Sequence, residues 1–414
     1  MFLEAADAPS RQSERRDRGL RVAYVYRTFS EVGSIPSLYR RLGETLSHDV
    51  DLTLFCSRRG RATTDAPLKF CDVEPLLAGD GRFRYAIECA TFAARAALAA
   101  RRTRGAFDLV HSEGFALPRA DLVTVHAVRA AEIDRYFAQI EPRATLRKRL
   151  PNIVRPQGAV VLAIERRLFA HPAPLCIVPS AQIKRDLEHF HDVPSELVRV
   201  IPYGIDVEGL QFDESERRRR RVDFGVGDDT LVVLFVGDSF LRKGLDTAIE
   251  GIAASRVRPE LWVIGGDDAS RYAQLAARLG VAQQVWFLGR RSQKEVAGFY
   301  SAADVLLLPS RNDAWGLPPI EAMVSGRVPV VSSFTGASEV IKHGTNGYVL
   351  RSAGGATEIA SLLDGPLSDP ATRRALGSRA VLDALEFAWP NVYPRLLDAH
   401  YEAHELLQSR LRAA

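Results

Sequence analysis

Residues 300–347, YSAADVLLLPSRNDAWGLPPIEAMVSGRVPVVSSFTGASEVIKHGTNG, decide the fold of this chain. They contain two short apolar runs, Asp304–Pro309 and Val328–Ser333, each of a length typical of a buried parallel strand. A polar loop and a helix are expected between the two runs, and Gly336–Lys342 is expected to form a second short helix. This order of strand, loop, helix and strand predicts a parallel sheet in an α/β protein.

The junction between the loop and the helix carries the groups that point to chemistry. Gly316, Leu317 and two prolines form the turn, and backbone N–H groups at the start of a helix attract anions. Asp313 precedes the turn, and we expect Glu321 in the first turn of the helix, so both carboxylates can face a crevice at the carboxyl ends of the strands. Taken singly, Asp313 is a loop or helix-capping acid and Glu321 a residue favoured by the helix dipole.

This stretch resembles the signature of glycosyltransferase family 4. The shared features are two acids with seven residues between them, the Gly-Leu-Pro turn and the following EAMVSGRVPVV. The resemblance implies a GT-B fold, a nucleotide-sugar donor and retention of the anomeric configuration. It assigns Glu321 to the ribose hydroxyls, Asp313 to the donor sugar, and the backbone of Gly316 and Leu317 to the diphosphate. The family usually has Glu in place of Asp313, which leaves the identity of the sugar open.

Length and composition set the class of protein. A chain of 414 residues favours two domains, and 46% hydrophobic with 26% charged residues is typical of a soluble globular protein. No apolar run reaches transmembrane length and no hydrophobic signal core begins the chain, so we expect a cytoplasmic protein, with peripheral contact at the inner face of the membrane as an option. No basic face interleaved with aromatic residues predicts a nucleic-acid partner. Free thiols and no zinc site are expected from the spacing of Cys56, Cys71, Cys89 and Cys176.

The first half of the chain alternates apolar runs with helical segments. Residues 1–19 are polar and lack periodicity, so they predict a flexible arm. A parallel, doubly wound sheet is predicted by the alternation that follows. Its expected strands are Leu20–Tyr26, Val50–Ser57, Phe107–His111, Leu122–Ala127 and Leu175–Ser180, and its expected helices include Pro36–Leu46 and Tyr85–Arg104.

Candidate site residues in this half follow the strands. Gly33 and Ser34 lie after the first strand, where the family carries a glycine pair near the donor phosphate and the acceptor; a Gly-Ser loop is otherwise a turn. His126 ends a strand, in the position where such sheets bind ligands. In the family a histidine after this T-V-H string contacts the donor sugar or the acceptor, although the usual following Asp is Ala127 here. A neutral histidine bonded to the loop backbone is the alternative for His126.

Two basic stretches are open to more than one interpretation. Residues 143–169 mix basic and apolar side chains and favour a solvated helical hairpin. The alternative for them is a face against anionic lipid or an anionic lipid-linked acceptor. Residues 215–221, SERRRRR, predict the solvent-facing side of a helix.

The second half opens with a phosphate-binding pattern. Residues 231–244, LVVLFVGDSFLRKG, give a strand, a short loop, the adjacent cations Arg242 and Lys243, and a glycine before a helix. Cations and helix-terminal amides together suit a phosphate, and a plain solvated loop is the alternative. In the family the corresponding cations neutralise the leaving diphosphate. The form GDSFLRKG is closest to the branch of lipopolysaccharide-core glucosyltransferases. Further along, Arg290 and Arg291 lie where the family receives the nucleotide base, and either is a candidate to stack on it.

The resemblance predicts a GT-B fold of two doubly wound Rossmann-like domains that face a cleft. We expect a flexible arm over 1–19, an acceptor-side domain over 20–204, a nucleotide-sugar-binding domain over 205–386, and a helix over 387–414 that returns to the first domain.

The implied function is that of a retaining hexosyltransferase. It moves a sugar from a nucleoside diphosphate sugar, such as a UDP- or GDP-sugar, to a hydroxyl of a glycan or lipid-linked acceptor in bacterial cell-surface polysaccharide or lipopolysaccharide synthesis. No metal or cofactor is implied, because Arg242 and Lys243 stand in for a cation. The alternatives are a nucleotide-sugar epimerase or hydrolase, and a non-catalytic GT-B subunit that binds a partner enzyme.

Overall fold

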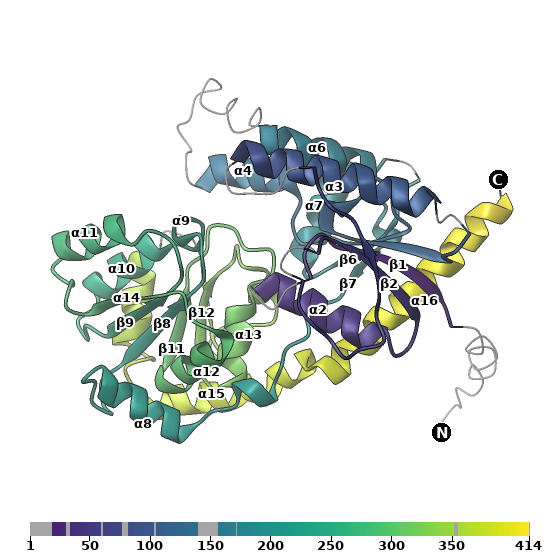
Figure 1. Cartoon of the computed structure of the whole chain (residues 1–414). Helices are drawn as coiled ribbons and strands as arrows, with labels where there is room; N and C mark the ends of the chain where they lie inside the picture. The colour runs from purple at the N-terminus through teal and green to yellow at the C-terminus, as the bar shows by residue number, and fades with distance from the viewer. Residues whose placement is uncertain are drawn as a thin grey trace, which may run out of the picture.

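Two parallel sheets, each covered by helices, form the two domains of the chain (Figure 1). The computed structural model describes residues 19–29, 34–58, 61–76, 82–102, 105–139, 156–170, 172–351 and 355–413. In the described residues the first sheet has the strand order β3-β2-β1-β4-β5-β6-β7 and the second the order β10-β9-β8-β11-β12-β13. Strand order reverses beside β1 in one sheet and beside β8 in the other, as in doubly wound folds. The predicted fold class is therefore confirmed.

The N-terminal domain contains β1 to β7. Its strands are β1 (Arg21–Val25), β2 (Asp51–Cys56), β3 (Lys69–Asp72), β4 (Leu109–Glu113), β5 (Leu122–Thr124), β6 (Leu175–Val178) and β7 (Val198–Val200). Its helices are α2 (Ser34–Leu46), α3 (Arg82–Arg102), α4 (Arg129–Gln139), α6 (Pro156–Leu168) and α7 (Ala181–His191). Strand β3 and helix α4 were absent from the sequence prediction, and β4 runs two residues beyond the predicted end.

The C-terminal domain contains β8 to β13. Its strands are β8 (Val232–Val236), β9 (Glu260–Ile264), β10 (Val285–Gly289), β11 (Val305–Leu308), β12 (Val328–Ser332) and β13 (Tyr348–Leu350). Its helices are α8 (Glu214–Asp223), α9 (Phe240–Lys243), α10 (Leu245–Ala254), α11 (Ser270–Arg278), α12 (Gln293–Ala302), α13 (Leu317–Val324), α14 (Ala356–Asp364) and α15 (Pro370–Ala384). A 3₁₀ turn, Gly336–Glu339, replaces the short helix predicted there. Strands β8 and β11 are buried at every residue, which matches their continuous apolar sequence.

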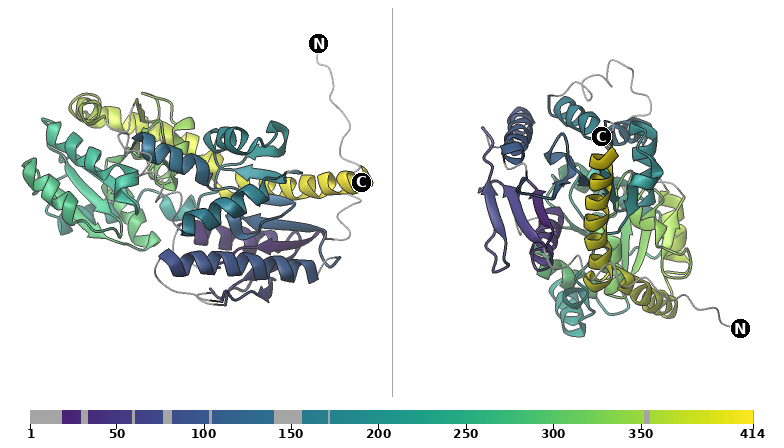
Figure 2. Two further views of the ribbon diagram at one scale, coloured as in Figure 1. Left: turned by 90° about the horizontal axis from the view of Figure 1, so that it is seen from above. Right: turned by 90° about the vertical axis from the view of Figure 1, so that its right-hand side faces the viewer.

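The last helix, α16 (Trp389–Ala413), extends from the C-terminal domain along the N-terminal sheet (Figures 1 and 2). It contributes Trp389, Leu396 and other apolar side chains to the core that also contains β1 and β2. Its buried His400 lies 3.0 Å from His111 of β4, measured between Nε2 and Nδ1. The chain passes between the domains near Ile205 and again near Phe387. These two segments are hydrogen-bonded to each other, since the Ile205 N–H donates to the Phe387 carbonyl at 2.8 Å.

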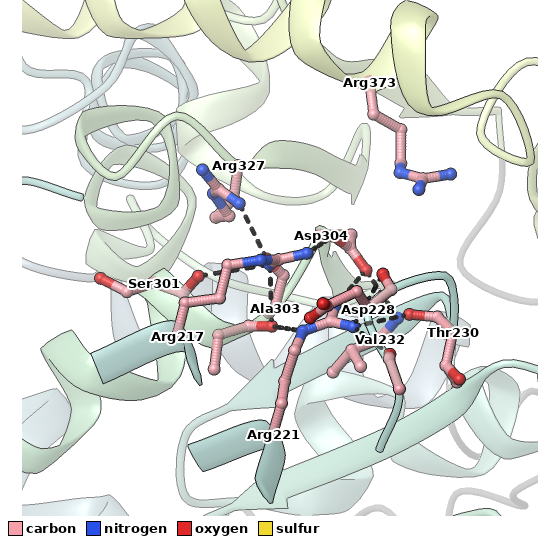
Figure 3. A network of polar contacts seen from close by, with 12 residues as sticks. Arg217, Arg221, Asp228, Thr230, Val232, Ser301, Ala303, Asp304, Arg327 and Arg373 are labelled. Atoms are coloured by element: carbon pink, nitrogen blue, oxygen red, sulfur yellow. Dashed lines mark hydrogen bonds and ion pairs between the residues drawn. The ribbon is translucent and has the colours of Figure 1, made fainter. Parts of the chain in front are cut away.

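The arginine run of α8 is partly buried, which corrects the prediction of a purely solvent-facing helix side. The side chain of Arg221 is 1% exposed and that of Arg217 is 18% exposed, and both form ion pairs with Asp304 (Figure 3). With Arg327, their guanidinium groups donate to carbonyls at the end of α12. Carbonyls at a helix end lack intrahelical partners and carry the negative end of the dipole, so three cations stabilise them. Asp304 precedes β11, so this cluster lies at the opposite edge of the sheet from the loops described next.

Candidate functional site

The carboxyl ends of β8, β11 and β12 bring three loops together. The Arg311 N–H donates to the Arg242 carbonyl at 2.8 Å, which joins the loop after β11 to the short helix α9. The Asp313 N–H donates to the Phe334 carbonyl at 2.9 Å and its carbonyl accepts from Gly336 at 2.8 Å, which joins the same loop to the turn after β12. The predicted donor residues of these segments are therefore gathered at one edge of the sheet.

Lys243 and Asp313 form the central ion pair of this edge. Lys243 Nζ lies 2.7 Å from Asp313 Oδ2, and the two side chains are 9% and 12% exposed. The position of Lys243 depends on Gly237, because a Cβ on Gly237 would approach the lysine Cε to 2.4 Å. Glycine at this point lets the lysine side chain lie across the end of β8.

The two cations hold Asp313 in its charged form. Burial opposes ionisation of this carboxyl, but the charges of Lys243 and Arg242 and the lysine hydrogen bond lower its pKa overall. Arg242 Nη1 lies 3.8 Å from Asp313 Oδ1 and also donates to the Asn312 carbonyl at 2.8 Å. The arginine side chain is 39% exposed, so part of its guanidinium faces solvent beside the pair.

The N-terminus of helix α13 lies beside the ion pair of Lys243 and Asp313. The helix begins at Leu317, so Glu321 lies in its second turn, which corrects the prediction of a first-turn position. Prolines 318 and 319 explain the early start, since a fixed φ and a missing N–H suit the first helical positions. Gly316 has a φ of +83° and no side chain caps the helix. The helix start is therefore open to an anionic group.

Glu321 is anchored by a tyrosine that the sequence did not single out. The Tyr300 hydroxyl donates to Glu321 Oε2 at 2.6 Å. Burial raises the pKa of Glu321, while the Tyr300 hydrogen bond and the charge of Lys243 act in the opposite direction. The influence of Lys243 places Glu321 within electrostatic reach of the central ion pair.

Arg290 directly follows β10, two strands away from β8 in the sheet. Its Nη2 is 2.7 Å from Asp238 Oδ2, and its side chain is 68% exposed. Asp238 also accepts from the Gly266 N–H at 2.7 Å, so it ties the ends of β8, β9 and β10 together. A Cβ on Gly266 would lie 2.9 Å from the arginine Nε, so the guanidinium lies directly over this glycine.

The N-terminal domain contributes a cluster of polar side chains around His126. This histidine follows β5, its side chain is 22% exposed, and burial lowers its pKa to about 3. Its ring contacts the hydroxyl groups of Tyr39 and Tyr203 and the carboxyl of Glu113. The ring is therefore held by side chains and not by the loop backbone alone. Of the other two predicted residues, Gly33 lies outside the described residues and Ser34 begins α2.

Contacts between the domains surround the loop that carries Asp313. The Ser180 hydroxyl donates to the Ala314 carbonyl at 2.8 Å, and Arg135 donates to the side chain of Asn312 at 3.3 Å. Glu339 accepts from the N–H groups of residues 181 and 182 at 2.9 and 3.0 Å, where it stabilises the N-terminus of α7. The loop after β11 is thus attached to the N-terminal domain.

Several residues of this region were not found from the sequence, namely Glu113, Tyr39, Tyr203, Tyr300 and Glu339. One signal could have revealed Glu113: it lies two residues after His111, on the same face of a strand that was ended too early. In the basic stretch 143–169, residues 143–155 lie outside the described part of the chain, so that interpretation stays a prediction. No helix among the described residues is long and apolar enough to cross a bilayer.

Two family models match this chain. Residues 37–208 match the model described as Glycosyltransferase Family 4, and residues 216–382 match the model described as Glycosyl transferases group 1. The two matches follow each other along the chain, and each covers less than half of it. Lys243, Asp313 and Glu321 all lie within the group 1 match.

Curated relatives match over about half of this chain. The chain is 30% identical over 240 residues to the uncharacterized glycosyltransferase MJ1607 of Methanocaldococcus jannaschii, covering 56% of this chain and 60% of the relative. It is 32% identical over 244 residues to a D-inositol 3-phosphate glycosyltransferase of Corynebacterium aurimucosum, covering 56% of this chain and 57% of the relative. The aligned part is thus less than two thirds of either relative.

Solved structures match the fold over nearly the whole chain. WaaG, a glycosyltransferase involved in lipopolysaccharide biosynthesis, matches with a TM-score of 0.74 and 20% identity, covering 92% of this chain and 99% of that chain. HepE of Anabaena in complex with UDP and glucose matches with a TM-score of 0.67 and 17% identity, covering 92% and 98%. At these identities the likeness shows the GT-B fold.

Proposed function

We propose that this protein transfers a glycosyl unit from a nucleoside diphosphate sugar to a hydroxyl of a glycan or lipid-linked acceptor, with retention of the anomeric configuration. The observation that carries the proposal is the placement of Lys243 and Arg242 beside Asp313, next to the uncapped start of α13. Two cations and a helix N-terminus at one point suit a diphosphate. A nucleotide donor is also consistent with the fold match to HepE, which was solved with UDP and glucose.

In this account the cations act on the leaving group. The bond between the anomeric carbon and the diphosphate oxygen breaks, so negative charge develops on the diphosphate. We assign Lys243 and Arg242 to this developing charge, because cations fixed beside a leaving group lower the barrier electrostatically. The acceptor oxygen forms the new bond to the anomeric carbon, and its proton passes to the departing phosphate oxygen.

The acids orient the donor. Asp313, held in its charged form by Lys243, accepts a hydrogen bond from a sugar hydroxyl. Tyr300 bonds to one oxygen of Glu321, and we assign the other oxygen to the ribose hydroxyls. His126 and its tyrosine neighbours line the side of the N-terminal domain that receives the acceptor. The phosphate-loop resemblance suggests a place in bacterial cell-surface polysaccharide or lipopolysaccharide synthesis.

The test is a turnover screen with defined products. Purified protein is incubated with UDP-, GDP- and ADP-sugars in EDTA, with lipopolysaccharide cores and lipid-linked oligosaccharides as acceptors. A glycoside with the anomeric configuration of the donor supports the proposal, and we expect EDTA to leave the rate unchanged because the two cations are part of the chain. Release of free sugar would indicate a hydrolase, an altered sugar nucleotide an epimerase, and no consumption of any donor a non-catalytic subunit.

A further inference from the structure

The loop that carries Asp313 lies between the two domains in an extended form. The backbone N–H groups of Arg311 and Asp313 donate to carbonyls of the C-terminal domain, and Trp315 belongs to the core of that domain. Asp313 also forms an isolated parallel β-bridge with the turn after β12. Because successive side chains of an extended segment point to opposite sides, Asn312 and Ala314 face away from this domain.

Both of these residues contact the N-terminal domain. The Ser180 hydroxyl donates to the Ala314 carbonyl at 2.8 Å. The Ala314 side chain packs against the apolar cluster that contains residues of β5 and β6. Arg135 Nη1 donates to Asn312 Oδ1 at 3.3 Å. The N-terminal domain therefore holds the residue before Asp313 and the residue after it.

Arg135 is itself fixed within the N-terminal domain. Its other terminal nitrogen, Nη2, forms an ion pair with Asp186 of α7, and the two side chains are 19% and 9% exposed. A planar guanidinium can bond to a carboxylate with one nitrogen and to an amide oxygen with the other, whereas a lysine ammonium lacks the second arm. Arg135 lies on α4, the helix that begins three residues after His126. The same helix thus follows the acceptor-side histidine and contacts the loop of the donor-side acid.

Asn312 has an arginine partner from each domain. Arg242 Nη1 donates to its backbone carbonyl at 2.8 Å, while Arg135 donates to its side chain. A displacement of Asn312 moves Asp313 as well, because a rigid planar peptide bond joins the two residues. The position of the Asp313 carboxylate therefore depends on a contact with the N-terminal domain as well as on its ion pair with Lys243.

We propose that Arg135 is a positioning residue for recognition of the donor sugar: its hydrogen bond to Asn312 holds the loop where the Asp313 carboxylate meets a sugar hydroxyl. The sugar contact is that of the proposed function, on which this inference rests. The groups assigned to the nucleoside diphosphate all lie in the C-terminal domain, so the bond affects affinity for the sugar and not for the nucleotide. Recognition of the sugar then depends on the N-terminal domain, although Arg135 itself does not touch it.

The hold on the loop can be tested without any ligand. Hydrogen exchange of backbone amides is followed by mass spectrometry in a peptide that spans residues 308–317. Arg135→Lys keeps a positive charge beside Asp186, and Asn312→Ala leaves the Arg135–Asp186 pair intact, so neither variant strands a buried charge. We expect each to speed exchange in this peptide about five- to tenfold, and the exposed control Asp134→Asn to leave it unchanged. Unchanged exchange in Arg135→Lys overturns the inference.

The effect on recognition is measured by calorimetric titration with UDP, GDP, ADP and their glucose and mannose conjugates. The quantity compared is the Kd of a sugar nucleotide divided by the Kd of its nucleoside diphosphate. We expect Arg135→Lys and Asn312→Ala each to raise this ratio about five- to tenfold. The double variant should raise it no further, because both changes remove the same bond. In an Asp313→Asn background, Asn312→Ala should leave the ratio unchanged.

These measurements separate positioning from other roles of the contact. Additive effects in the double variant, or an effect of Asn312→Ala that persists in Asp313→Asn, contradict the inference because the bond would then not act through Asp313. A lower Tm of Arg135→Lys with an unchanged Kd ratio would show a purely structural contact and also contradicts it. If the wild type binds no nucleotide and no sugar nucleotide, the proposed function fails, whereas hydrogen exchange still decides whether Arg135 holds the loop.

Discussion

Lys243 and Asp313 are 70 residues apart in the chain, and their side chains meet at 2.7 Å in an ion pair that is nearly closed to solvent. The pair joins α9, which follows β8, to the loop after β11, the two central strands of the C-terminal sheet. A buried ion pair is rarely needed for stability alone, because desolvation offsets most of the attraction. Because the Lys243–Asp313 pair lies at the uncapped start of α13, it is suited to anion binding.

Removing the charge of Asp313 should strengthen nucleotide binding and lower turnover. In Asp313→Asn the lysine loses its counter-charge, so a nucleoside diphosphate should bind more tightly, by about fivefold if the change is about 1 kcal/mol. Turnover should fall, because the sugar loses a charged acceptor. Calorimetric titration with UDP, GDP and ADP and the donor assay measure the two effects. The exposed control Asp229→Asn should change neither, and weaker nucleotide binding in Asp313→Asn would refute this role.

Replacing Glu321 should chiefly weaken donor binding. A hydrogen bond to a charged acceptor contributes about 1.5–3 kcal/mol, so Glu321→Gln should raise the donor Kd by about 10- to 100-fold. The matched control is Glu250→Gln, an exposed acid on α10 of the same domain. An unchanged donor Kd in Glu321→Gln would exclude the ribose contact.

The buried arginine cluster predicts a stability effect within the SERRRRR run. Arg221→Ala leaves Asp304 buried without its closest cation and should lower the free energy of unfolding by about 3–5 kcal/mol. Arg218→Ala, three residues earlier in the same helix, removes a side chain that is 71% exposed and should change it by less than about 0.5 kcal/mol. Urea denaturation of both variants measures the difference, and equal effects would contradict the burial of Arg221.

Glu113 predicts a pH dependence of stability with a definite sign. Burial raises its pKa from 4.5 to about 8 in the folded protein, so between these values the folded state holds a proton that the unfolded state has lost. Stability therefore falls as pH rises through this window, by up to about 1.4 kcal/mol per pH unit from this group. Relative to the wild type, Glu113→Gln should gain stability between pH 5 and pH 8. A constant difference between the two proteins over this range would be evidence against a raised pKa.

Local sequence patterns were enough to predict the strands of the C-terminal domain and the place of its two adjacent cations. Strands β8 and β11 are continuous apolar runs, and Arg242 and Lys243 lie in α9, the first helix after β8. The position of Glu321 was wrong by one turn because two prolines move the helix start back to Leu317.

Contacts between distant segments could not be predicted. Nothing in the sequence around Arg221 shows that the end of α12 accepts its hydrogen bonds, or that Glu339 reaches α7 of the other domain. Likewise, nothing in the sequence shows that the Tyr203 hydroxyl contacts the ring of His126, 77 residues earlier in the chain. A single sequence gives the type of side chain but no partner at a separation of 70 residues or more.

The most direct test of the central claim is a thermal-shift measurement with nucleotides. Wild type, Lys243→Ala and the exposed control Lys294→Ala are heated with UDP, GDP, ADP and their sugar conjugates in EDTA. A ligand at 100 times its Kd stabilises the folded state by about 2.7 kcal/mol, so one nucleotide family should raise the Tm of the wild type and of Lys294→Ala. Lys243→Ala should show no shift. No shift with any nucleotide, or an equal shift in Lys243→Ala, would contradict the assignment of Lys243 to the donor diphosphate.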